Sequence, residues 1–360
     1  MKKKVLIVGP GPDFIGGISE FISGMRNSSL QNDFELILFD SLAIKQRDKI
    51  IVNTKLSLIE LRRTLRVFIH LHMYLVKYSK AAVHIHSSSY WSFYEKLVIL
   101  IIAKLHCRKV YFHIHGGVFI SFYQNSRLKR LFRVLLSLAD TIISVSPEIK
   151  EIINLPLKTI VIGNGINLPD LERNPVRKFS KLTFLSVSVL EYRKRIDLIL
   201  EAVKQIKSAG YSNFQFVFAG DGPVRDELMN LIQDNGLEDV VDYQGVVRNK
   251  EKDDLFRKSH VFISTSLAES FGISIAEGMS YGLGIISTAE GIASFCLNNG
   301  NGIVIPKNDV EALAEAMLSY ITEEQNLATQ SIYNYNYINE NYSWKKIAGE
   351  ISNVYQNRSS

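Results

Sequence analysis

Short apolar runs rich in Val and Ile alternate with longer segments of helical periodicity along this 360-residue chain. This alternation constrains the fold strongly, because it is typical of parallel βαβ units. We predict strands at residues 4–9, 34–40, 82–87, 109–115, 141–146 and 159–165, and again at 182–188, 214–220, 240–245, 260–266 and 283–289. The sequence therefore predicts an α/β protein with two doubly wound parallel sheets.

The segment 166–181 separates the two sets of strands. It contains prolines and mixed charges without apolar periodicity, so we predict a linker between two domains. A chain of 360 residues, 46% of them hydrophobic, has enough apolar side chains for two cores. Parallel sheets of this kind bind ligands beyond the carboxyl ends of their strands, so we expect the chemically important motifs there.

The sequence favours a protein of the reducing cytoplasm. Cys107 and Cys296 lack the spacing of a metal knuckle or a redox pair. The apolar run after the initial lysines ends at Gly9, too early for a signal peptide. The run at 97–103 is too short to span a bilayer, which needs about 20 apolar residues. We expect a cytoplasmic protein, peripheral at most on the inner face of the membrane.

Charge is distributed unevenly along the chain. Residues 1–170 carry 23 Lys and Arg against 12 Asp and Glu, whereas residues 171–360 carry 19 against 24. Basic residues alternate with apolar ones in 62–66, 104–109 and 127–133. This pattern fits either solvated helix faces or docking on an anionic membrane that salt would reverse. No motif of a nucleic-acid-binding fold accompanies these residues, so we do not expect nucleic acid as a partner.

A glycine-rich turn follows the first strand, in GPGPDFIGGISEF at 9–21. Gly16 and Gly17 open the next helix and could bring backbone amides to a phosphate. A dinucleotide fingerprint is the alternative, with Asp40 as the acid that binds a ribose, but Phe14 stands where the third glycine is required. An NAD-dependent enzyme is therefore a partial match.

Histidines end two neighbouring strands, in HIHSSS at 84–89 and FHIHGG at 112–117. We expect His113 and His115 to point to opposite faces of their strand, so that only His115 reaches the ligand-binding edge. His86 holds the equivalent place one strand earlier. A third ligand at recognisable spacing is missing, so we expect no metal site.

Strand ends in the second half supply cations and a further glycine turn. Arg193, Lys194 and Arg195 follow the strand 182–188, where they suit either a diphosphate or a solvated surface. Gly220 lies in the turn AGDGP, and Val246 lies in QGVV, whose backbone could bracket a flat base.

The stretch AESFGISIAEGMSYG at 268–282 places Glu269 before a short helix and Glu277 inside it. Both carboxylates can accept hydrogen bonds from the hydroxyls of a ribose or a sugar. The amides at the helix start could bind phosphate oxygens. The two glutamates could also be the acid and nucleophile of a glycosidase, but a helix N-terminus opposes the raised pKa that a proton donor needs. The first amides belong to Ser270, Phe271, Gly272 and Ile273.

Together these motifs resemble the family 4 retaining glycosyltransferases, which have the GT-B fold of two facing Rossmann-like domains with an interdomain cleft. The resemblance covers nearly the whole chain. Glutamates enclosing seven residues, in ESFGISIAE, are its most specific element. The other segments that carry it are GGISEF, HGG, SVSPEIKE, VIGNGIN, FAGDGP and YSWKKIAGEISNVY.

The resemblance implies three parts of the chain. Residues 1–168 form an acceptor-side domain and residues 169–341 a nucleotide-sugar-binding domain. Residues 342–360 contain a final helix that crosses back to the first domain.

The resemblance also implies roles for individual residues. Glu277 binds the ribose of a nucleotide sugar, and Glu269 binds hydroxyls of the transferred sugar. Lys194 neutralises the departing diphosphate, and His115 lies by the transferred sugar. No metal or cofactor is required, because cations and helix dipoles stabilise the leaving group. The further donor-binding positions are Gly16, Gly17, Gly220, Val246, Ser270, Phe271, Gly272 and Ile273.

The implied reaction moves a sugar from a UDP- or GDP-linked donor to a hydroxyl of an oligosaccharide or lipid-linked acceptor, with retention of configuration, in the assembly of bacterial cell-surface polysaccharide. One pair departs from the family: Ser188 and Val189 stand where Gly and Arg are usual, so we expect Arg193 to supply the missing guanidinium. A nucleotide-sugar-binding module or an epimerase of the same layout is the alternative, although no convincing acid and base pair for epimerisation is found.

Overall fold

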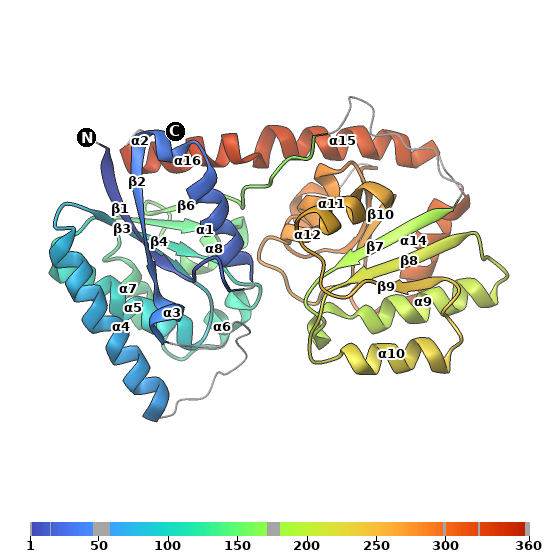
Figure 1. Cartoon of the computed structure of the whole chain (residues 1–360), viewed down its shortest axis with the longest axis horizontal. Coiled ribbons are helices and arrows are strands. Elements are labelled where there is room, and N and C mark those ends of the chain that lie inside the picture. The colour runs from blue at the N-terminus through green and yellow to red at the C-terminus, as the bar shows by residue number, and fades with distance from the viewer. Residues whose placement is uncertain are drawn as a thin grey trace. The chain divides into compact units, whose positions relative to one another are not determined.

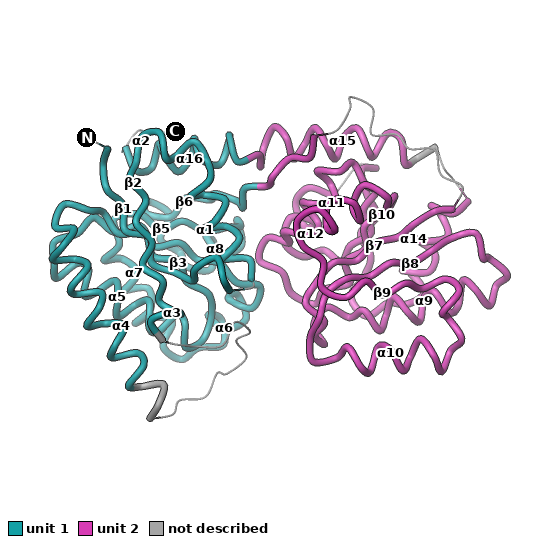
Figure 2. Tube along the Cα trace, in the orientation of Figure 1, with its two compact units in different colours: residues 1–165, 344–360 teal, residues 166–343 magenta. Residues whose placement is uncertain are grey.

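The computed structural model describes residues 2–14, 16–45, 58–170, 181–297, 300–322 and 325–356. The chain forms two compact units, residues 1–165 with 344–360 and residues 166–343 (Figure 2). The expected boundaries, after residues 168 and 341, lie close to these two transitions. Of the expected linker, residues 171–180 lie outside the described residues.

The first unit is built on a parallel six-stranded sheet in the order β2-β1-β3-β4-β5-β6. The six strands predicted for the first half of the sequence are all present. The inner strands are buried on both faces, which explains their nearly continuous apolar sequence. The strands are β1 (Lys3–Gly9), β2 (Phe34–Asp40), β3 (Ala82–Ser87), β4 (Val110–Ile114), β5 (Thr141–Ser144) and β6 (Thr159–Val161).

Helices connect these strands. Three successive connections, from β2 to β5, step in the same direction across the sheet, so their helices α4, α5 and α7 share one face. The middle helix α5 contacts both of the others (Figure 1). The helices of the unit are α1 (Gly17–Asn27), α2 (Leu30–Asp33), α3 (Ser41–Lys45), α4 (Leu58–Lys77), α5 (Trp91–Leu105), α6 (Phe119–Asn125), α7 (Lys129–Leu136), α8 (Pro147–Ile153) and the C-terminal α16 (Trp344–Gln356).

The C-terminal helix α16 packs against α1 and α2 of the first unit. Trp344 lies over two glycines: a Cβ on Gly24 would be 2.1 Å from its ring, and one on Gly165 would be 2.5 Å away. At the other end of the helix, the Tyr355 hydroxyl lies 2.5 Å from Nδ1 of His84. Small residues therefore make the space into which the end of the chain docks.

The second unit contains another parallel six-stranded sheet, in the order β12-β11-β10-β7-β8-β9. Five of its strands were predicted. The sixth, β12, was missed because it has only three residues, between glycine-rich chain and Pro306. The strands are β7 (Leu182–Val187), β8 (Phe214–Ala219), β9 (Val241–Tyr243), β10 (Val261–Ser264), β11 (Gly284–Thr288) and β12 (Ile303–Ile305).

Apolar side chains from both the sheet and its helices form the core of the second unit. Phe184 and Phe216 on the strands and Ile199 and Val203 on α9 are fully buried in it. The predicted α/β class with two parallel sheets is confirmed. The helical elements are η1 (Tyr192–Lys194), α9 (Ile196–Ser208), α10 (Arg225–Asp234), α11 (Asn249–Lys258), α12 (Ile273–Ser280), α13 (Ala293–Cys296), α14 (Val310–Thr322) and α15 (Gln325–Tyr342).

Within the described part of the chain, no helix combines the length and the apolar composition needed to cross a bilayer.

Candidate functional site

The turn after β7 carries the predicted cations and is fixed to the loop after β10. The single hydroxyl proton of Thr265 is shared between the carbonyls of Lys194 and Arg195, which lie 2.8 and 2.9 Å from Oγ1. The amide of Leu267 donates to the carbonyl of Arg193 at 2.8 Å. The carboxyl ends of β7 and β10 therefore present their loops as one connected surface.

Lys194 and Glu269 form an ion pair across these two loops, with side chains that are 12% and 14% exposed. The same carboxylate oxygen accepts a hydrogen bond from the Ser266 hydroxyl at 2.9 Å. Burial acts to raise the pKa of Glu269, but the charge and hydrogen bond of Lys194 outweigh it, so the pKa lies below its usual value. An ionised Glu269 accepts hydrogen bonds and does not donate a proton, which argues against a glycosidase acid at this position.

Arg193 supports the loop that carries Glu269. Its guanidinium donates to the carbonyl of Ala268 at 2.8 Å and pairs with Glu191 at 2.6 Å. The next cation, Arg195, pairs with Asp197 at 2.9 Å. That Arg193 supplies the guanidinium missing at Val189 stays a prediction.

The helix α12 begins where the sequence predicts it. Its N-cap residue Gly272 has φ 79° and ψ 60°, in the left-handed region that favours glycine. The preceding Phe271 is buried, and its carbonyl accepts a hydrogen bond from the Ile292 amide at 2.6 Å. Just over one turn into the helix, Glu277 accepts a hydrogen bond from Lys252 of α11 at 2.6 Å.

A small pocket lies at the carboxyl ends of β7 and β10. Its lining includes Ser188, Lys194, Ser266 and Ser274. A cation, three hydroxyls and the first turn of α12 therefore border one space. Hydroxyls, an ammonium group and a helix N-terminus together form a site suited to an anion such as a phosphate.

Gly220 lets the ends of β7 and β8 approach each other closely. A Cβ at this position would lie 1.8 Å from the carbonyl oxygen of Ser188, and its φ is 141°. Its amide donates to the carbonyl of Gly245 at 2.7 Å. Val246, the next residue along that loop, is half-exposed.

In the first unit, Gly16 and Gly17 stand at the start of α1, as the sequence predicts. Asp40, the acid on which the NAD alternative depends, binds nearby backbone amides instead. Its Oδ1 accepts hydrogen bonds from the amides of Leu42 and Ala43, at 3.0 and 2.9 Å, and so caps α3. This engagement weakens the dinucleotide interpretation.

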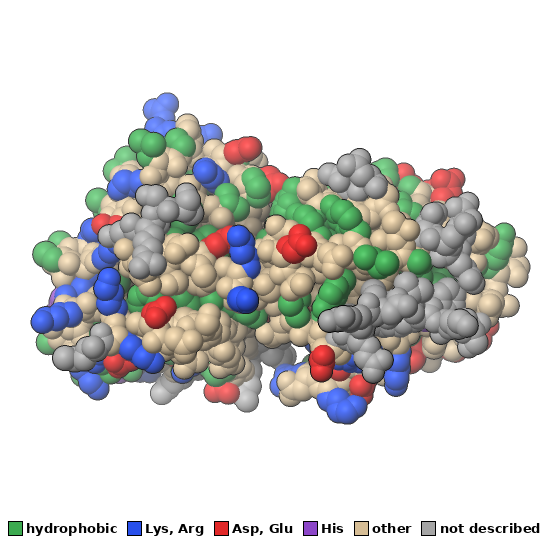
Figure 3. All heavy atoms as spheres, turned by 90° about the horizontal axis from the view of Figure 1, so that it is seen from above, with side chains coloured by type: hydrophobic (Ala, Val, Ile, Leu, Met, Phe, Trp, Pro, Cys, Tyr) green, Lys and Arg blue, Asp and Glu red, His purple; other side chains and the backbone are tan. Residues whose placement is uncertain are grey.

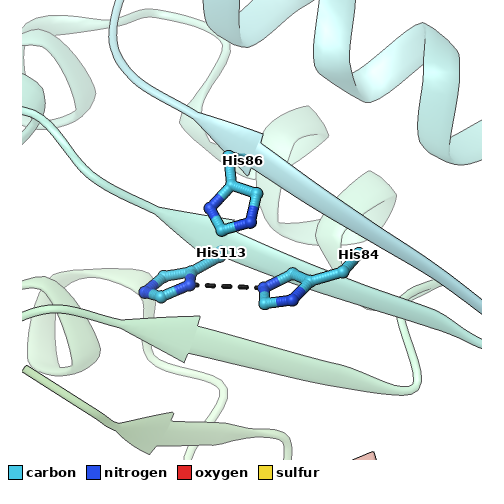
Figure 4. Close-up of side chains that lie close together, drawn as sticks. All are labelled: His84, His86 and His113. Carbon is cyan, nitrogen blue, oxygen red and sulfur yellow. Dashed lines mark hydrogen bonds between the residues drawn. The ribbon is translucent and has the colours of Figure 1, made fainter. Parts of the chain in front are cut away.

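The expectation that His113 and His115 point to opposite faces is wrong. Residues two positions apart share a face of a strand, and the two ring centroids are 4.0 Å apart. His86 and His84 of β3 lie beside them, with His86 Nδ1 3.0 Å from His115 Nε2. Figure 4 shows His84, His86 and His113, with His84 Nε2 3.3 Å from His113 Nδ1. Four histidines therefore form one buried cluster.

The expectation that a third metal ligand is missing is also wrong, because three histidines lie close together in the structure. Ligand nitrogens of His84, His86 and His113 lie within 4.8 Å of one another. Burial lowers the pKa of His84 and of His115 to about 3 and lowers the pKa values of His86 and His113 well below the usual range. The rings are therefore neutral at neutral pH, which is the form that can bind a metal ion.

Three residues at the second-unit site were not singled out from the sequence. Ser266 and Ser274 border the pocket, and Lys252 pairs with Glu277. The two serines could have been found, because one ends the predicted strand 260–266 and the other lies in the first turn of the predicted helix. Lys252 lies in the charged segment NKEKDD, where nothing in the sequence distinguishes it from a surface lysine.

The fold and this site define a two-unit α/β protein whose second unit has a strand-end pocket with a lining suited to an anion. The crystal structure of Anabaena Alr3699/HepE in complex with UDP and glucose superposes with a TM-score of 0.74, at 19% identity, covering 99% of this chain and 100% of that one. The fold is therefore the GT-B fold. Residues 170–337, nearly all of the second unit, match the family described as glycosyl transferases group 1, and the resemblance to family 4 glycosyltransferases is confirmed.

Two curated relatives match over part of the chain. One, a component of the human phosphatidylinositol N-acetylglucosaminyltransferase, is 30% identical over 61% of this chain and 47% of its own length. The O-antigen chain mannosyltransferase C of Escherichia coli is 29% identical over 54% of this chain and 55% of its own length. The chain thus spans about half the length of these relatives.

Proposed function

We propose that the protein is a retaining glycosyltransferase that moves a hexosyl or N-acetylhexosaminyl group from a UDP- or GDP-linked donor to an acceptor hydroxyl. The observation that carries this proposal is the Lys194–Glu269 ion pair beside the first turn of α12, in a unit that matches the group 1 family. The lysine and the helix N-terminus bind the diphosphate, and the carboxylate accepts hydrogen bonds from sugar hydroxyls.

The proposed reaction needs no covalent intermediate and no metal. The bond between the sugar anomeric carbon and the phosphate oxygen breaks, and the acceptor oxygen bonds to that carbon on the same face. The departing phosphate takes the acceptor proton. Lys194 and the α12 amides stabilise the charge that develops on the leaving diphosphate, while Glu269 orients the sugar through its hydroxyls.

The donor contacts of the resembling family are proposed here residue by residue. Glu277 binds the ribose hydroxyls, and the backbone of 270–273 holds sugar and phosphate oxygens. Gly220 and Val246 contribute backbone to the nucleoside. Within the first unit, Gly16, Gly17 and His115 take part in the same reaction, as the resemblance implies.

We propose an oligosaccharide or lipid-linked acceptor, in the assembly of a bacterial cell-surface polysaccharide such as O-antigen, capsule or exopolysaccharide. The names of the relatives support this class, since one is a mannosyltransferase of an O-antigen chain and another belongs to an N-acetylglucosaminyltransferase of phosphatidylinositol. The protein then works in the cytoplasm, as a peripheral protein at an anionic membrane.

Release of free nucleoside diphosphate tests the function. The purified protein is mixed with candidate nucleotide sugars, with and without candidate acceptors. We expect acceptor-dependent release with one donor and a product of unchanged anomeric configuration. Conversion of the donor to an epimeric nucleotide sugar, or tight binding without turnover of any donor and acceptor, would contradict the proposal in favour of an epimerase or a binding module.

A further inference from the structure

Exposed apolar side chains are concentrated on three adjacent helices of the first unit. In the described part of the chain, eleven of the twenty large hydrophobic side chains that are exposed belong to α4, α5 or α7 or lie within two residues of them. Single exposed apolar residues are normal, but a contiguous apolar surface marks a binding site.

The helix α4 has two apolar faces. Val67, Leu71 and Leu75 are fully buried in the unit. Leu65, Ile69, Met73 and Val76 recur at helical spacing on the solvent side, and they are 58%, 55%, 60% and 59% exposed. An ordinary surface helix buries its apolar stripe and exposes polar residues, so packing against the described residues of this unit does not explain the second stripe.

The helix α7 repeats this arrangement on a shorter scale. Phe132 and Leu136 are buried, whereas Leu131 and Val134 are 50% and 63% exposed. Leu128 and Leu138, which flank the helix, are also exposed.

The helix α5 joins the two apolar stripes. The rings of Phe93 and Phe132 lie 5.2 Å apart, which holds α5 against α7. Arg108, just after α5, donates to the carbonyl of Leu75 on α4 at 2.8 Å. Leu105, at the end of α5, is 78% exposed. We call this surface, the outward sides of α4, α5 and α7, the α4–α7 face (Figure 1).

Cations accompany the apolar side chains of the α4–α7 face. Residues 58–77 contain four Lys and Arg and one acid, and residues 126–138 contain four Lys and Arg and no acid. Arg62 and Arg66 on α4 and Arg130 and Arg133 on α7 are exposed. On the side shown in Figure 3, Lys and Arg side chains of the first unit are interspersed with Asp and Glu.

We propose that the α4–α7 face inserts its exposed apolar side chains into the interfacial region of an anionic bilayer, with its arginines at the lipid headgroups. Apolar side chains between cations are the composition of interfacial membrane-binding surfaces. A second copy of the chain fits less well, because a two-fold contact would place these arginines against each other. This inference deepens the membrane contact of the proposed function and names the surface that makes it.

Insertion predicts a salt response that differs from docking by charge alone. Salt screens the arginines but strengthens apolar burial. Membrane binding should therefore fall when salt is raised and level off at a residual value, whereas a purely electrostatic contact would be released completely.

Vesicle flotation tests the α4–α7 face. Vesicles of phosphatidylcholine with phosphatidylglycerol are mixed with the full chain at low and at high salt. We expect the wild type to float at low salt and in part at high salt. The double variant Ile69→Ser/Met73→Ser should lose the salt-resistant part and bind at least about tenfold less, since each apolar side chain contributes to partitioning. Arg130→Gln/Arg133→Gln should reduce the dependence on phosphatidylglycerol, because only Arg62 and Arg66 of the four arginines remain.

Matched controls separate this result from unfolding and from loss of catalysis. Leu157→Ser removes a fully exposed leucine that lies outside the α4–α7 face, and it should float like the wild type. Donor turnover with a soluble acceptor should be unchanged in the Ile69→Ser/Met73→Ser variant, which also shows that it is folded. Equal flotation of this variant and the wild type would overturn the inference. The inference would also be overturned if the wild type formed a dimer in the absence of vesicles and the Ile69→Ser/Met73→Ser variant did not. Normal flotation with no donor turnover would contradict only the proposed function.

Discussion

At the scale of single residues, Lys194 contacts both Glu269 and the strand-end pocket. In this structure its ammonium group pairs with Glu269, and it also borders the strand-end pocket. The ion pair keeps Glu269 ionised and holds the lysine at the pocket. A diphosphate that enters the pocket would add a second negative partner, so the lysine is positioned before the donor arrives.

Replacement of the two turn cations should impair catalysis. We expect Lys194→Ala and Arg193→Ala each to lower turnover by more than about tenfold. The first removes the positive charge that stabilises the leaving diphosphate, and the second removes the guanidinium that supports the loop carrying Glu269. Steady-state kinetics measure both effects. Lys204→Ala, which removes an exposed lysine of α9, is the matched control and should behave like the wild type. Normal kinetics for Arg193→Ala would remove Arg193 from the site.

At the scale of secondary structure elements, the sequence predicted most of the architecture. Apolar runs bounded by turn residues were sufficient for every strand except β12, and Gly272 with the acids around it located α12. Side-chain pairings between elements could not be predicted, because they depend on which strands and helices become neighbours. The contacts of His84 with His113 and of Lys252 with Glu277 are of this kind.

The packing of α16 on the first unit gives a test at this scale. Gly24→Ala should lower the stability of the first unit by about 1–3 kcal/mol, because the added methyl would overlap the ring of Trp344. Replacing a glycine inside a helix by alanine normally increases stability, so the clash with Trp344 reverses the usual effect. Gly349→Ala in α16 is the matched control, since its added Cβ meets no atom within 4 Å, and it should stabilise by about 0.5–1 kcal/mol. Chemical denaturation measures both, and equal effects of the two substitutions would contradict the packing described here.

At the scale of the whole molecule, the buried histidine cluster makes stability depend on pH. Burial lowers the pKa values of all four rings, to about 3 for His84 and His115, while in the unfolded chain they titrate near 6.5. The unfolded state therefore binds more protons below that pH. Stability from this cluster is fully present above pH 6.5 and is lost as the pH falls towards 3.

Unfolding at a series of pH values checks this dependence. For each unit by which the pH falls between 6.5 and about 3, each buried histidine should raise the unfolding equilibrium constant up to about tenfold. His113→Gln should reduce the slope of stability against pH, whatever its effect at neutral pH. His70→Gln on α4, outside the cluster, should leave the slope unchanged. A slope unaffected by His113→Gln would mean that the cluster opens before it titrates.

A crystal structure of the protein with bound UDP tests the central claim most directly. We predict that the diphosphate lies within hydrogen-bonding distance, about 2.7–3.2 Å, of Lys194 Nζ and of amides in the first turn of α12, with the ribose hydroxyls at Glu277. Nucleotide bound instead at the glycine-rich turn 9–17, with the pocket between β7 and β10 empty, would contradict the account.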